Sequence, residues 1–205
     1  MLSVTVPAPD LSLLSIAELR AAAGIDDRSQ DAELRKLGLR VAARIAAHCN
    51  IRRDGPKPAT LRQETIVETF RLEPRHAGRT SVIILARRPV ASVVYLAFDD
   101  VTQDLEKLTV NASAGLVDWC QPLRHRHVEI SYVAGWQDVP DDLKLAASAL
   151  VQQYLAASAQ EPGLRSISIP NVEERQYWIG HPTDPDIPQN IADMLAPYRN
   201  EDGAL

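Results

Sequence analysis

Cysteine is scarce in this sequence, which has only Cys49 and Cys120 among its 205 residues. Two thiols are too few for the dense disulfide framework of a small secreted domain. The chain also does not open with a charged segment followed by an apolar core, as a secretory signal would. We therefore expect an intracellular protein with both thiols reduced.

Long hydrophobic runs and aromatic residues are also few. The longest apolar runs, such as residues 82–86, are far shorter than the ~20 residues that a membrane helix needs. An aromatic content of 5% argues against a large platform for stacking sugars or bases. The net charge of −5 gives no overall attraction to nucleic acid or to membranes. We expect a soluble globular protein that has no membrane partner.

Motifs for catalysis or metal binding are missing from the sequence. It contains no P-loop and no GxGxxG turn. Asp118, Cys120, His125 and His127 cluster within ten residues, but their spacing matches no established zinc pattern, and a solvated basic turn explains His125 more simply. A nucleophilic pair of histidine with Cys49 or Cys120 lacks a companion motif, so we expect buried thiols. The prediction is no enzyme activity, no metal and no cofactor.

Local signals mark three helices. Ser15 and Glu18 form a capping box, which predicts a short helix that begins there. A longer helix is expected over residues 31–48, because apolar residues recur there every three or four positions. After a strand that breaks at Gly135, Pro140 suits the first position of a third helix. The apolar stripe of this helix follows at helical spacing: Leu143, Ala147, Leu150 and Tyr154.

Between residues 61 and 135 the pattern changes to short strands bounded by turn residues. The candidate strands are 65–72, 82–86, 92–98, 108–110, 116–120 and 127–133. Beyond the third helix, prolines interrupt an extended segment before a last short helix after Pro188. The sequence therefore predicts an α+β fold. It comprises a small α-helical bundle (1–60 and 136–162), an inserted antiparallel β module (61–135) and an extended C-terminal arm (163–205), with Leu150 and Val41 in one helical core.

Four stretches, taken in order, resemble a known family. They are residues 14–20 (LSIAELR), the acidic turn into the helix that ends with Ala46-Ala47-His48, residues 85–93 (LARRPVASV), and residues 132–136 (YVAGW) leading to 139–144 (VPDDLK). In their order and spacing they are similar to the small head-to-tail connector, or adaptor, proteins of long-tailed bacteriophages and gene transfer agents. The compact members of that family lack so long a β insertion and C-terminal arm.

The resemblance implies a structural protein without catalytic activity that assembles into a ring of about twelve copies. The ring would dock beneath the portal protein of a filled capsid, extend the DNA channel and provide a platform for the next neck or tail-completion protein. The protein would then reside in the virion neck, after assembly in the bacterial host cytoplasm. Two other classes stay open: an oligomeric scaffold or binding module of non-phage function, and an enzyme whose site is assembled from distant residues.

Two sets of residues are candidates for contacts with partners. Lys36, Arg40 and Arg44 share one face of the long helix, which is either a contact with a neighbouring subunit, a face toward passing DNA, or an ordinary solvated surface. The arm interleaves apolar and polar residues, a composition able to add as a strand or to insert between neighbouring proteins. We expect the arm to lie outside the subunit's core. Its predicted partner-binding residues are Ile167, Ile169, Val172, Tyr177, Trp178 and Ile179.

Overall fold

The computed structural model describes residues 1–72, 81–121, 127–158, 166–169, 173–176 and 187–200. Its contacts divide the chain into two units. The helical unit comprises residues 12–41 and 140–198, and the β unit comprises residues 1–11, 42–139 and 199–205. The predicted α+β class is confirmed, because helices and antiparallel sheets both make up the described residues.

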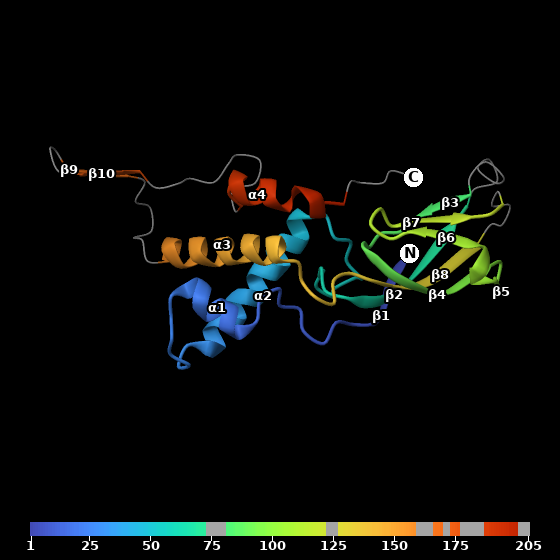
Figure 1. Ribbon diagram of the computed structural model, residues 1–205, viewed down its shortest axis with the longest axis horizontal. Helices are drawn as coiled ribbons and strands as arrows, with labels where there is room; N and C mark the ends of the chain where they lie inside the picture. The colour runs from blue at the N-terminus through green and yellow to red at the C-terminus, as the bar shows by residue number, and fades with distance from the viewer. Residues whose placement is uncertain (73–80, 122–126, 159–165, 170–172, 177–186, 201–205) are drawn as a thin grey trace. The chain divides into compact units, whose positions relative to one another are not determined.

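The helical unit is built around α3 (Asp141–Ser158). This helix packs against α1 (Ile16–Ala23) and α4 (Gln189–Leu195), which flank it in Figure 1. The unit also contains the first part of α2 (Asp31–His48) and a short 3-10 helix at Ala196–Tyr198. The predicted bounds of α2 are confirmed.

Local capping fixes the ends of α1. The Ser15 hydroxyl accepts a hydrogen bond from the Glu18 backbone N–H, and the Glu18 carboxylate accepts one from the Ser15 backbone N–H. Gly24 closes the helix in the left-handed conformation, with φ of 67°, which a residue without Cβ adopts at low cost. The predicted capping box is therefore confirmed.

The apolar stripes of the helices are buried as predicted. Leu143, Ala147 and Leu150 of α3 are fully buried, and so is Val41 of α2 at 1% exposed. The extensive contacts of α3 are those with α1 and α4, so the packing of Leu150 directly against Val41 stays a prediction. Tyr154, at the end of the α3 stripe, is 36% exposed.

The β unit contains two antiparallel sheets. The five-stranded sheet has the order β1-β2-β8-β4-β5, and the three-stranded sheet has the order β3-β7-β6. The first sheet consists of β1 (Leu2–Val6), β2 (Glu64–Arg71), β8 (His127–Ala134), β4 (Val90–Phe98) and β5 (Val101–Thr102). The second consists of β3 (Val82–Ile84), β7 (Leu116–Trp119) and β6 (Leu108–Asn111), with a 3-10 helix at Leu105–Lys107 before β6.

The two sheets share one hydrophobic core. Alternate residues of β8, including Val128, Ile130 and Tyr132, are fully buried, as the period of two along a strand requires. Phe98 meets Trp119 of the other sheet edge to face, with ring centroids 5.2 Å apart. This aromatic contact joins the core faces of the two sheets.

The observed units differ from the expected boundaries at both ends of the chain, and residues 42–60 and 136–139, expected in the helical bundle, belong to the β unit. The first residues, expected in the helical part, form β1 and pair with β2. Residues 187–198, expected in an arm outside the core, belong to the helical unit, where Ile187, Ile191 and Leu195 are buried. The physical reason is that α4 covers an apolar side of α3, which would otherwise face water.

Candidate interaction surfaces

The basic residues of α2 differ in exposure. Lys36 and Arg40 are exposed, whereas Arg44 is half-buried. The Lys36 ammonium lies 2.8 Å from the Glu33 carboxylate one turn earlier, in a pair whose side chains are mostly in water. Such a solvent-exposed pair contributes little stability. Lys36 and Arg40 are therefore the two members of this set whose charge reaches the surface, and their binding role stays a prediction.

Between these cations lies an exposed leucine that sequence reasoning missed. Leu39 is 44% exposed, although it stands in an 18-residue helix with a well-buried stripe. It is neither three nor four residues from Leu34 or Val41, and so it falls on the face away from the core. An apolar residue out of phase with the buried stripe is the signal that could have found it.

The outward face of α3 also carries an exposed leucine, and the charged group beside it is a carboxylate instead of a cation. Leu145 is 61% exposed, and Asp141, four residues earlier, is exposed on the same side. From Leu145 to Ser158 the sequence of this helix contains no charged residue at all. Water-facing helix surfaces are ordinarily rich in charge, so this face is unusually apolar.

Ion pairs hold the helices of this unit in place. The Arg20 guanidinium donates two hydrogen bonds to the Asp31 carboxylate, at 2.7 and 2.6 Å. This contact lowers the pKa of Asp31 below its usual value and fastens α1 to the start of α2. The Lys144 ammonium lies 3.0 Å from the Glu18 carboxylate, which links α3 to α1. A Cβ on Gly38 would stand 3.0 Å from the Leu19 side chain, so α1 and α2 approach closely there.

The predicted partner-binding arm contains a β-hairpin. Its strands are β9 (Ser166–Ile169) and β10 (Glu173–Gln176), which pair antiparallel with Ile167 opposite Arg175. Ile167 and Ile169 thus lie on β9. The other predicted residues, Val172, Tyr177, Trp178 and Ile179, lie outside the described residues. The part of the arm that precedes α4 lies between α3 and α4 in the sequence, and these two helices pack together.

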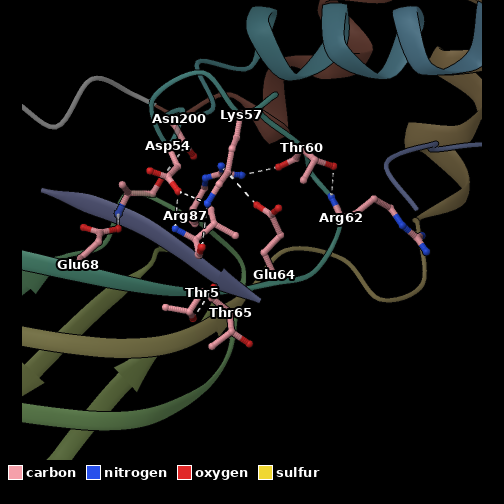
Figure 2. A network of polar contacts seen from close by, with 12 residues as sticks. Thr5, Asp54, Lys57, Thr60, Arg62, Glu64, Thr65, Glu68, Arg87 and Asn200 are labelled. Atoms are coloured by element: carbon pink, nitrogen blue, oxygen red, sulfur yellow. Dashed lines mark hydrogen bonds and ion pairs between the residues drawn. The ribbon is translucent and has the colours of Figure 1, made fainter. Parts of the chain in front are cut away.

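A buried polar network braces the β unit (Figure 2). The Arg87 guanidinium donates a hydrogen bond of 2.6 Å to the Thr60 carbonyl and lies 3.5 Å from the Glu64 carboxylate, whose side chain is 5% exposed. Burial raises the pKa of Glu64 above its usual value, and the nearby Arg87 charge partly offsets this effect. Burial lowers the pKa of Arg87 for the same reason, because it disfavours the charged form of each group. Sequence reasoning missed this network, because charged residues in a strand region read as solvent-facing.

A second buried carboxylate, Glu68, belongs to the same β unit. It accepts a hydrogen bond from the Tyr132 hydroxyl and one of 2.9 Å from the Ala86 backbone N–H. Burial raises the pKa of Glu68, and these two hydrogen bonds lower it in part. Nearby, the Asp54 carboxylate accepts from the Val4 backbone N–H at 2.9 Å, which ties the loop before β2 to β1. The Glu68 and Asp54 carboxylates thus accept hydrogen bonds from groups of the β unit itself, so their role is structural.

Asn200 fastens the end of the described chain to the β unit. Its amide nitrogen donates to the Ala86 carbonyl at 3.0 Å, and its amide oxygen accepts from Arg88 at 2.7 Å. Its backbone N–H donates to the Cys49 carbonyl at 2.9 Å. These hydrogen bonds fix the chain where it returns from the helical unit.

The thiols and histidines form no reactive arrangement in the described part of the chain. Cys49 is fully buried, as predicted, and burial raises its pKa to about 12, which keeps the thiol protonated. The expectation that Cys120 is buried was wrong: it is exposed, because Trp119 before it faces the core and strand alternation turns Cys120 outward. His125 lies outside the described residues. Among the residues that are described, no three potential ligands gather around a metal position.

The helices in the described ranges also lack a membrane span, since none is both long enough and apolar enough to cross a bilayer.

A family model for head completion proteins matches residues 12–200, nearly the whole chain. The chain belongs to the head completion protein family. This match confirms the resemblance to head-to-tail connector proteins and the structural role at the head-to-tail junction of a phage-like particle that the resemblance implied.

The fold is shared with solved structures from phage-like particles. A chain from the neck of an empty gene transfer agent particle, computed with C6 symmetry, is similar at a TM-score of 0.60 and 18% identity, over 98% of this chain and 96% of that one. A chain from the virion of a native gene transfer agent particle is similar at a TM-score of 0.59 and 18% identity, over 98% of this chain and 96% of that one. A chain from the neck of a native gene transfer agent particle, computed with C12 symmetry, is similar at a TM-score of 0.59 and 17% identity, with the same coverage of both chains. No curated protein matches the sequence.

Proposed function

We propose that this head completion protein assembles as a ring beneath the portal protein, extends the DNA channel of a filled capsid, and presents a platform to the next neck or tail protein. The observation that carries the proposal is the family match over residues 12–200. It is supported by the similarity of the fold to chains from necks that were computed with C6 and C12 symmetry. The role is geometric and requires neither catalysis nor a cofactor.

The arm between α3 and α4 is the proposed contact with the portal or with an adjacent subunit. An isolated two-stranded hairpin such as β9–β10 is marginally stable in water, and it gains stability when it pairs with or packs on a further surface. The arm is bounded by α3 and α4, which pack together, so a contact made by β9 and β10 would be carried on a segment that is anchored at both of its ends. Ile167 and Ile169 are the described residues of the proposed contact.

Deletion of the gene for this chain, from the genome that encodes the particle, tests the proposed function. We expect DNA-filled heads that lack tails, and normal tailed particles when the wild-type chain is supplied in trans. Tailed, infective or transfer-competent particles without the chain would contradict the proposal. The counts of tailed and tailless heads by electron microscopy are the measurement.

Replacement of residues 164–180 by a Gly-Ser linker of the same length tests the arm separately. This variant retains α4 and its buried Ile191 and Leu195, so its melting temperature should stay close to that of the wild type. Attachment to purified portal-bearing heads should be lost. A variant that attaches normally would place the docking contact elsewhere on the subunit, and a variant that unfolds would place the arm in the core.

A further inference from the structure

Two outward helix faces of the helical unit each carry an exposed leucine and differ in the sign of the charge beside it. The α2 face carries Leu39, 44% exposed, beside the exposed cations Lys36 and Arg40. The α3 face carries Leu145, 61% exposed, beside the exposed carboxylate of Asp141. Each face thus has one large exposed apolar side chain beside charged groups. On α2 two cations stand against the single carboxylate of Glu33, and on α3 the charge is the carboxylate of Asp141.

The rest of each face permits a close approach of another helix. On α3 the outward positions after Leu145 include Gln152 and Ala156, which are uncharged, exposed and small or flexible. On α2 the outward positions before Lys36 are the exposed Ala32 and Glu33, and the Glu33 carboxylate pairs with Lys36 at 2.8 Å. The centres of protein interfaces are depleted in charge and keep their charged residues at the side, which is the pattern that both faces show.

We propose that the α2 face of one copy packs against the α3 face of the next copy, with Leu39 against Leu145 and the cations Lys36 and Arg40 toward Asp141. This inference rests on the proposed ring, and it names the surfaces that close it. The two faces differ from each other, so the contact is heterologous, and repetition of a heterologous contact generates a ring when the rotation closes. A solvated face explains the exposed cations but not the two exposed leucines on faces of opposite charge.

Exchange of the charges in separate copies provides the test. R40D places a carboxylate opposite Asp141, and D141R places a guanidinium opposite Lys36 and Arg40, so neither variant should self-associate as the wild type does. A mixture of the two should associate again, because the new carboxylate on the α2 face of the R40D copy meets the new guanidinium on the α3 face of the D141R copy, and the two unchanged faces also match. Sedimentation velocity should show each variant with an association constant at least about tenfold below that of the wild type, and recovery in the equimolar mixture.

Matched controls separate the interface from general charge effects. R53D and E106R reverse exposed charges in the β unit and should leave association unchanged. Rising salt should weaken the wild-type assembly, since the contact is partly electrostatic. A second pair, L39D and L145R, alters the two leucines, which are 44% and 61% exposed and belong to no buried stripe. Its single variants should fail and its mixture should recover, which keeps the test valid if D141R does not fold.

The outcomes distinguish this inference from the proposed function. Rings of the wild type that persist in all four single variants would overturn the proposed surfaces and leave the ring intact. Failure of the single variants without recovery in either mixture would also overturn the pairing. A wild-type chain that stays monomeric at every concentration would overturn the inference, whereas the gene deletion decides the proposed function independently. Loss of binding to double-stranded DNA in R40D with normal assembly would assign the α2 cations to DNA instead.

Discussion

Replacement of Arg87 by methionine should destabilise the β unit by about 3–5 kcal/mol, which is the usual cost of removing one partner of a buried ion pair. Arg87 and Glu64 have side chains that are each 5% exposed, so neither charge is solvated by bulk water. Methionine fills much of the same volume but leaves the Glu64 carboxylate without its nearby cation and the Thr60 carbonyl without its donor. The loss therefore comes mainly from an uncompensated buried charge.

The pH dependence of this variant follows from the direction of the pKa shift. Burial already raises the folded-state pKa of Glu64, and removal of Arg87 should raise it further. A carboxyl group whose folded pKa is raised keeps its stability below its unfolded pKa of about 4.3, and stability is lost as pH rises through the folded pKa. R87M should therefore lose less stability in acid than at neutral pH.

Urea unfolding measures the loss in free energy of unfolding. Hydrogen exchange of the β8 amides shows that the loss occurs in the β unit itself. The double variant E64Q/R87M removes both charges and should recover part of the loss, because no buried charge is left uncompensated. Arg53→Met, at an exposed position, is the control and should change the unfolding free energy by less than about 0.5 kcal/mol. A loss below about 1 kcal/mol in R87M, or a double variant no more stable than R87M, would refute this reasoning.

Three further predictions concern single positions. Gly135→Ala should cost at least about 2 kcal/mol in thermal or urea unfolding, because φ is +98° there and the new Cβ would stand 2.4 Å from the Arg62 carbonyl oxygen; full stability would show that this turn rearranges freely. Leu150→Ala should cost about 2–5 kcal/mol, since the side chain is fully buried in the helical unit, and a loss below about 0.5 kcal/mol would show that α3 is peripheral. Glu68→Gln should keep the hydrogen bond from Tyr132 while it removes a buried charge, so stability should no longer fall as pH rises through the raised folded pKa of Glu68. An unchanged pH profile of unfolding in this last variant would contradict the assignment.

The helices could be predicted from the sequence because their signals are local. The capping box of Ser15 and Glu18 acts within one turn, and the stripe of α2 repeats within 18 residues. The last short helix after Pro188 was also predicted and is confirmed as α4. Its burial against α3 was not, because that contact joins segments more than 30 residues apart in the chain and no local pattern encodes it.

The β unit shows where sequence reasoning stops. Leu2, Val4 and Val6 alternate with polar residues and so carried a strand signal, but β1 pairs with β2 some 60 residues away, a partner that alternation cannot identify. The burial of Arg87 and Glu64 could not be inferred either, since a charged residue is ordinarily at the surface and only the completed fold encloses it. Leu39 and Leu145 are different, because their position off the buried stripes was readable in advance.

The charge of the chain bears on which way the α2 cations face. A channel through which DNA passes must not hold it, and affinity for DNA grows with the number of phosphates that lysine and arginine neutralise. Each copy carries a net charge of −5, so a ring of copies is negative overall and favours passage over binding. Exposed rows of Lys36 and Arg40 turned toward the lumen would act against this, whereas the same cations placed against Asp141 of a neighbour are neutralised within the ring. The charge balance therefore supports an inter-subunit position for the α2 face over a position that lines the channel.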